Sequence, residues 1–116
     1  EQEGVITGYR ANLDPLKMGF NFLAIVFATL KEGDKKAVSA FEEAVEEIPQ
    51  IVLAQRLFGD PDYLMHVVTR DLPAFQKLYD DKLSAMPGVQ HLRSTLVMKT
   101  VVQDRPFPLE SVNLTR

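Results

Sequence analysis

The fold of this chain is decided around one stretch, Arg56-Leu57-Phe58-Gly59-Asp60-Pro61-Asp62-Tyr63-Leu64-Met65. It places a glycine, a proline and two carboxylates between two apolar runs rich in β-branched and aromatic residues. Glycine, proline and aspartate favour the backbone angles of tight connections. The stretch therefore predicts two consecutive strands, residues 50–58 and 63–70, joined by a short loop.

Two amphipathic helices flank these strands. The first is predicted over residues 34–47, because apolar residues recur there at helical spacing, Asp34 can cap its start and Pro49 follows its end. The second is predicted over residues 72–85, after a capping Asp71.

The order of these elements predicts the fold class. Residues 22–30 and 89–102 also have strand composition, so the order is strand, helix, strand, strand, helix, strand. The order repeats itself, since Ile48-Pro49-Gln50-Ile51 and Met86-Pro87-Gly88-Val89 occupy the same place after each helix. This is an α+β, ferredoxin-like βαββαβ pattern, with an antiparallel sheet and two helices on one face.

The second face of that sheet needs a cover of its own. The strand over residues 22–28 is apolar on both sides, whereas two helices cover only one face of a sheet. A second copy packing sheet to sheet would supply the cover and give a dimeric α/β barrel-like sandwich. An N-terminal arm folded over the face is the alternative.

The chain is predicted to have three parts. These are a linker strand or arm over residues 1–14, a ferredoxin-like domain over residues 15–103 and an extended tail over residues 104–116, where Pro106 and Pro108 interrupt any period. The absence of an initiator Met and of a signal-peptide pattern at Glu1 indicates a fragment of a longer protein.

Composition limits the function classes. The 116 residues are 46% hydrophobic and 25% charged, as expected for one globular domain, and no apolar run predicts a membrane span. A formal charge of -3 gives this chain no electrostatic basis for binding nucleic acid by itself. The absence of cysteine excludes disulfides, a thiolate nucleophile and Cys-ligated metals, and it fits a cytoplasmic protein.

Several motifs follow one another in an order that resembles the C-terminal effector-binding domain of the Lrp/AsnC (leucine-responsive, feast-famine) transcription regulators. They are Gly59-Asp60-Pro61-Asp62-Tyr63, Asp71-Leu72-Pro73-Ala74-Phe75, Leu83-Ser84-Ala85-Met86-Pro87-Gly88-Val89 and Arg93-Ser94-Thr95-Leu96-Val97. The opening Gly4-Val5-Ile6-Thr7-Gly8-Tyr9 resembles the linker that follows the family's winged helix-turn-helix, so the resemblance covers about residues 4–102.

The resemblance implies an effector-sensing and oligomerisation domain that is not an enzyme and needs no cofactor. It implies a homodimer and a higher oligomer such as an octamer, with DNA bound only through an N-terminal domain absent from this chain. An amino acid or similar small effector would bind at the interface between dimers. The implied effector-binding residues are Phe58, Gly59, Asp60, Asp62, Tyr63, Arg93, Ser94 and Thr95, with Leu72 and Leu96 as further lining from neighbouring subunits.

Elementary chemistry is compatible with such a site. Asp60, Asp62 or loop carbonyls can accept from the ammonium group of a zwitterion, and Arg93 can donate two hydrogen bonds to its carboxylate. Gly59 permits positive φ and close backbone approach. Pro61 departs from the family pattern, which more often has an aromatic or other non-proline residue there. It removes an amide donor and stiffens the loop, so the identity of the effector stays open.

Other interpretations remain open from sequence. The Gly59 loop could be a simple turn. Asp60 and Asp62 resemble the start of a calcium loop, but the required later Gly and Glu are missing, so no metal is expected. His66 and His91 each fall within a predicted strand, where they could meet as ligands or as an acid-base pair, but they fit surface or interface positions better. A small dimeric α+β barrel enzyme of the monooxygenase kind, or a stand-alone amino-acid-binding module, would have the same element order.

Overall fold

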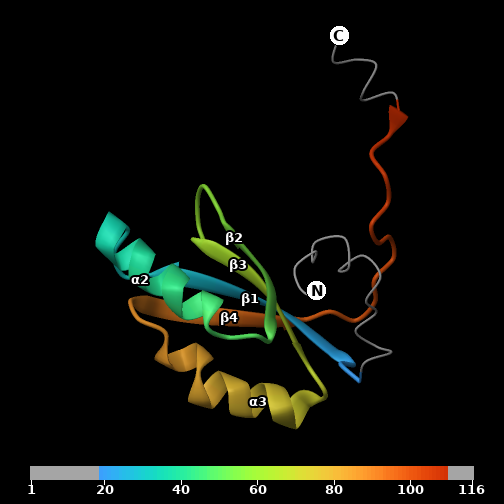
Figure 1. The fold of residues 1–116 in the computed structure, drawn as a ribbon, viewed down its shortest axis with the longest axis horizontal. Coiled ribbons are helices and arrows are strands. Elements are labelled where there is room, and N and C mark those ends of the chain that lie inside the picture. The colour runs from blue at the N-terminus through green and yellow to red at the C-terminus, as the bar shows by residue number, and fades with distance from the viewer. Residues whose placement is uncertain (1–18, 110–116) are drawn as a thin grey trace, which may run out of the picture. The chain divides into compact units, whose positions relative to one another are not determined.

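The computed structural model describes residues 19–109 (Figure 1). The chain divides into two units, and the fold below is that of the unit formed by residues 14–97. The predicted linker strand or arm over residues 1–14 lies outside the described residues, as do residues 110–116 of the predicted tail.

The structure confirms the predicted ferredoxin-like fold. The elements are β1 (Phe22–Leu30), α2 (Lys35–Glu46), β2 (Ile51–Arg56), β3 (Tyr63–Thr69), α3 (Leu72–Asp81), the short 3-10 helix η1 (Leu83–Ala85) and β4 (Val89–Leu96). The four strands form one antiparallel sheet in the order β2-β3-β1-β4. The two central strands, β1 and β3, are therefore flanked by the edge strands β4 and β2 (Figure 1).

Both helices begin where their caps predict. The Asp34 carboxylate accepts a hydrogen bond from the Ala37 N–H at 2.8 Å, and Asp71 accepts one from the Ala74 N–H at 2.9 Å. The end predicted for the second helix was wrong, because α3 stops at Asp81, where the next residue, Lys82, leaves helical geometry with φ −127°. The chain then makes the single turn η1.

The last strand is shorter than the 89–102 predicted from composition. Its ladder with β1 ends at the pair Ala24 and Leu96, followed by one bond from the Val97 N–H to the Leu23 carbonyl at 3.0 Å. Because β1 begins at Phe22, which would face Met98 in this register, a strand continuing to residue 102 would have no partner strand. Residues 98–108 form no helix or strand, and they expose large apolar side chains such as Met98 and Phe107.

One face of the sheet carries the core. Alternate residues of β1, including Val26, are fully buried, together with Phe41 of α2, Met65 of β3 and Leu83 of η1. Phe75 and Leu78 of α3 belong to the same cluster, so both helices pack on the same face. The space between sheet and helices is thus filled with apolar side chains.

The opposite face, here the open face, carries the remaining residues of each strand. On the central strands these include Leu23, Ile25 and Phe27 of β1 and Leu64 and His66 of β3, all of them partly exposed. Since α2 and α3 lie on the other side, the described unit leaves this apolar surface open to solvent. Among the described residues, no helix is long and apolar enough to cross a membrane.

Candidate functional site

The loop between β2 and β3 is closed at its base. The Leu57 N–H donates to the Asp62 carbonyl at 2.8 Å, which leaves residues 58–61 as a tip. Phe58 is fully exposed at this tip. Gly59 has φ +142°, a conformation that side chains disfavour, which explains the glycine at this position.

The register of β4 decides which of its side chains can meet the loop. Arg93 pairs with Phe27, and Thr95 pairs with Ile25, so both side chains lie on the open face. Ser94 pairs with the buried Val26 and therefore faces the helices. Strand alternation thus separates Ser94 from the other two polar residues of the predicted site.

A hollow on the open face brings the loop and β4 together. This open-face hollow has a volume of about 400 Å³ and is lined by Phe27, Thr29, Asp60, Pro61, His91, Leu92 and Arg93. The Arg93 guanidinium lies over the Phe27 ring, 5.0 Å from its centroid. The hollow therefore holds a cation and a carboxylate, contributed by residues far apart in the sequence.

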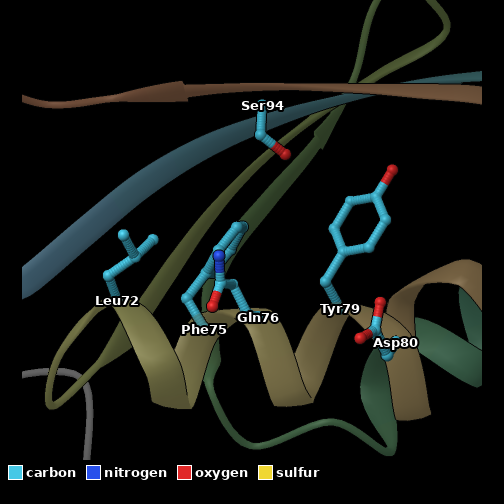
Figure 2. A pocket seen from close by; sticks show the side chains of 6 residues that line it. All are labelled: Leu72, Phe75, Gln76, Tyr79, Asp80 and Ser94. Carbon is cyan, nitrogen blue, oxygen red and sulfur yellow. The ribbon is translucent and has the colours of Figure 1, made fainter.

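A second hollow lies on the helix side of the sheet. This α3 groove, of about 510 Å³, is lined by Leu72, Phe75, Gln76, Tyr79, Asp80 and Ser94. Figure 2 shows Ser94 pointing from β4 towards α3, and the labelled Leu72, Phe75 and Tyr79 of α3 pointing towards the sheet. The groove contains a carboxylate, an amide and hydroxyl groups, but among its lining residues there is no cationic side chain.

The predicted site residues are thus divided between several environments. Asp60 and Arg93 line the open-face hollow, and Leu72 and Ser94 line the α3 groove. Thr95 lies on the open face, whereas Leu96 lies half exposed at the end of β4 on the helix side. Phe58 and Gly59 lie at the exposed loop tip.

The two remaining predicted residues make intramolecular hydrogen bonds. The Asp62 carboxylate accepts from the Leu30 N–H at 2.8 Å. The Tyr63 side chain lies in the core against Phe41, with ring centroids 4.6 Å apart, and its hydroxyl donates to the Glu42 carboxylate at 2.5 Å. Burial, and then this bond, raise the pKa of Tyr63 to about 12, so the phenol stays protonated at neutral pH.

Five lining residues of the open-face hollow were missing from the predicted site, namely Phe27, Thr29, Pro61, His91 and Leu92. Phe27 and Thr29 belong to an ordinary apolar strand pattern, and His91 was expected mainly as a surface or interface residue. Phe27, Thr29 and His91 reach the hollow because Phe27 pairs with Arg93 and Thr29 pairs with His91. Strand register of this kind cannot be read from one sequence. Within residues 19–109, no group of three or more His, Asp or Glu side chains is placed to hold a metal ion.

Comparison with known proteins gives a consistent result. The sequence profile of the Lrp/AsnC ligand binding domain matches residues 23–107. The chain is 37% identical, over 89% of its length, to the proline dehydrogenase transcriptional activator of Rhodobacter capsulatus and covers 67% of that protein. It is 34% identical, over 96% of its length, to the leucine-responsive regulatory protein of Escherichia coli K12 and covers 68% of it.

Solved structures agree with the sequence matches. A transcriptional regulator of Neisseria meningitidis in complex with L-Met superposes with a TM-score of 0.80 at 27% identity, covering 94% of this chain and 70% of that one. AsnC of Escherichia coli superposes with a TM-score of 0.77 at 20% identity, covering 90% of this chain and 69% of that one, which supports the fold. The chain therefore belongs to the Lrp/AsnC family of transcriptional regulators, and it contains the ligand-binding domain of that family.

Proposed function

We propose that this domain senses an amino acid or a similar small zwitterion, bound in the open-face hollow, and responds through the assembly of its subunits. The relative from Neisseria meningitidis that is similar in fold and sequence was solved with L-Met, which supports an amino acid as the ligand class. We further propose that the domain is not an enzyme, since the named relatives are transcription regulators.

The observation that carries this proposal is the shared position of Asp60 and Arg93 in one hollow. An α-amino acid presents a carboxylate and an ammonium group on the same carbon. Arg93 can donate two parallel hydrogen bonds to the carboxylate, and Asp60 can accept from the ammonium group. Phe27 and Pro61 offer apolar contact to the ligand side chain.

The open side of the hollow requires a neighbour to complete it. In a single chain the hollow opens to solvent on the same face that exposes Ile25 and other apolar residues. We propose that the domain forms a homodimer through the apolar central part of this face and that dimers assemble further, such as into an octamer. The hollow, which lies beside the edge strand β4, would then be at the contact between dimers. Phe58, Gly59 and Thr95 would border the ligand, while Leu72, Ser94 and Leu96 would contact it from a neighbouring subunit.

DNA binding would belong to the part of the protein outside this chain. The chain spans about two thirds of the length of its curated relatives, which are transcription regulators. We propose that the full-length protein binds DNA through an additional domain and works in the cytoplasm. Effector binding would then shift the geometry or number of assembled subunits.

Isothermal titration calorimetry with the twenty standard amino acids tests the ligand class and the site together. We expect at least one to bind, and we expect Asp60→Asn to weaken it about tenfold or more, because a charge-assisted contact is lost. Asp80→Asn is the matched control, since it removes a carboxylate from the α3 groove instead. Arg93→Gln and Arg56→Gln form a second pair, because Arg56 lies on the helix side of the sheet.

Two outcomes would overturn the proposal. Binding that is lost in Asp80→Asn but kept in Asp60→Asn would assign the ligand to the α3 groove. A chain that binds none of the twenty amino acids, and that sedimentation shows to be a monomer at working concentration, would remove both the sensing and the assembly role.

An enzymatic alternative of the monooxygenase kind receives less support. Such a catalyst would need a polar pocket between sheet and helices, whereas the centre of that space holds the fully buried Phe41, Met65 and Leu83. The α3 groove at its edge has no histidine and no cationic side chain among its lining residues. The amino-acid-sensing function is therefore the better account of the described side chains.

A further inference from the structure

We infer that Asp62 is a positioning residue of the proposed effector site and that its carboxylate does not contact the effector. Instead, the side chain fastens the β2–β3 loop to the end of β1 and so fixes Asp60 in the wall of the open-face hollow. This inference rests on the proposed function, because it concerns the same site. It changes the role expected for Asp62 from sequence, where its charge was assigned to the ligand.

Two hydrogen bonds of Asp62 continue the pairing between β1 and β3 beyond its last residue pair. Pairing between β1 and β3 ends at Ala28 and Tyr63. Beyond this pair, the Asp62 N–H donates to the Ala28 carbonyl at 2.9 Å, and the Asp62 Oδ2 accepts from the Leu30 N–H at 2.8 Å. A single residue thus satisfies both backbone groups that face the loop, because its side chain acts in place of a strand carbonyl.

The sequence explains why a side chain, and not a backbone carbonyl, accepts the hydrogen bond of the Leu30 N–H. Pro61 precedes Asp62 and has no N–H, so a regular ladder cannot continue through it. The carbonyl of Asp62 is also engaged, since it accepts from the Leu57 N–H at 2.8 Å. Asp62 therefore closes the loop base and ties it to β1 at the same time.

The end of β1 is also the point where the two walls of the hollow meet. Leu30 pairs with Val89 at the start of β4, and the next residue, Lys31, donates its N–H to the Gly88 carbonyl at 2.8 Å. β4 continues from there to Arg93. The loop wall with Asp60 and the β4 wall with Arg93 are therefore both attached to β1 at Leu30.

This arrangement fixes the separation of the two charged groups that the effector would bridge. Without the Asp62 carboxylate, the tip would remain attached through the backbone of residue 62, but it would lose its bond to Leu30. Asp60 is exposed and makes no hydrogen bond among those described for the loop, so its position depends on this attachment. A looser loop would bind a bridging ligand more weakly, because ordering it on binding costs conformational entropy.

Asparagine and alanine separate the two possible roles of Asp62. Asp62→Asn removes the charge but keeps an amide oxygen that can accept from the Leu30 N–H. Asp62→Ala removes both. Asp60→Asn, which removes a charge proposed to touch the effector, is the matched control. The ligand probe is whichever of the twenty standard amino acids binds the unmodified chain most tightly.

Two measurements follow on each variant. In the ligand-free state, hydrogen exchange of the Leu30 amide should be about tenfold faster in Asp62→Ala and within about threefold of the parent in Asp62→Asn, since the bond is lost only in the former. In calorimetry, Asp62→Asn should bind within about threefold of the parent, whereas Asp62→Ala and Asp60→Asn should each bind about tenfold or more weakly.

The outcomes are distinguishable. If Asp62→Asn loses affinity as Asp60→Asn does while its Leu30 amide stays protected, the charge of Asp62 contacts the effector and the inference is wrong. Unchanged Leu30 exchange in Asp62→Ala would also overturn it. If Asp62→Ala does not fold, Asp62→Asn alone decides. A positioning role predicts an effector affinity close to that of the parent, whereas a direct contact with the effector predicts a weakened affinity. A parent chain that binds no amino acid refutes the proposed function, while Leu30 exchange still decides whether the attachment exists.

Discussion

Replacing Tyr63 by phenylalanine should change how the stability of this domain depends on pH. The Tyr63 side chain is 3% exposed, and its hydroxyl donates to the Glu42 carboxylate at 2.5 Å. Burial and this contact with an anion raise the pKa of Tyr63 from 10.0 to about 12. Both causes favour the protonated phenol in the folded state.

The sign and size follow from linkage. The folded pKa is raised, so the contribution of Tyr63 to stability is complete below about pH 10 and is lost as the pH rises from about 10 to 12. In this window the unfolded chain releases the phenolic proton while the folded chain keeps it. A shift of about two units corresponds to a loss of at most about 2.7 kcal/mol in the free energy of unfolding.

Urea unfolding at several pH values between 8 and 12 measures the effect. At pH 8, Tyr63→Phe should be less stable by about 1 kcal/mol, because it loses one hydrogen bond to an exposed carboxylate that water can solvate. Between about pH 10 and 12 the parent should lose up to about 2.7 kcal/mol more than the variant, so the order of stability should reverse. Tyr79→Phe is the control, since it removes a hydroxyl outside this contact.

A difference between parent and Tyr63→Phe that stays constant from pH 8 to 12 would refute the reasoning. It would mean that folding leaves the ionisation of Tyr63 unchanged. A reversal that also occurs in Tyr79→Phe would assign the alkaline loss to another group.

Three further changes test the fold. Phe41→Ala should lower the free energy of unfolding by about 3–5 kcal/mol in urea titration, because Phe41 is fully buried; a loss under about 1 kcal/mol would contradict the packing described for the core. Asp34→Ala should cost about 1 kcal/mol, since it removes the cap on the Ala37 N–H, while Asp34→Asn should cost only a few tenths. Equal losses in the two Asp34 variants would instead point to the charge. Gly59→Ala should cost about 1–3 kcal/mol through its φ of +142° alone, because an added Cβ meets no neighbour; an unchanged thermal midpoint would mean that the loop relaxes freely.

Local rules were enough to predict most of the fold. Asp34 and Asp71 mark the helix starts, because capping depends on residues three positions apart. The ends were harder to predict. Composition cannot show that β4 stops short of residue 102, since its neighbour β1 begins at Phe22 and offers no partner beyond residue 98.

The candidate site could be predicted only in part, for the same reason. Asp60 and Arg93 were both included in it, but the short run Arg93-Ser94-Thr95 was treated as one cluster although alternation along a strand separates Ser94. Phe27 and Thr29 could not be found, because only the register between β1 and β4 brings them to the hollow. Local chemistry predicts which interactions a side chain can make, whereas pairing between distant strands decides which other residues share a site with it.

The closed base of the β2–β3 loop has a consequence for how such a domain can diversify. Since the Leu57 N–H and the Asp62 carbonyl seal the base, residues 58, 60 and 61 lie outside the buried cluster that holds the sheet and helices together. Substitutions at these positions should therefore leave folding nearly intact while they reshape one wall of the open-face hollow. Descendants of one ancestral domain could acquire new chemical preferences by small steps at this tip, without passing through an unstable intermediate.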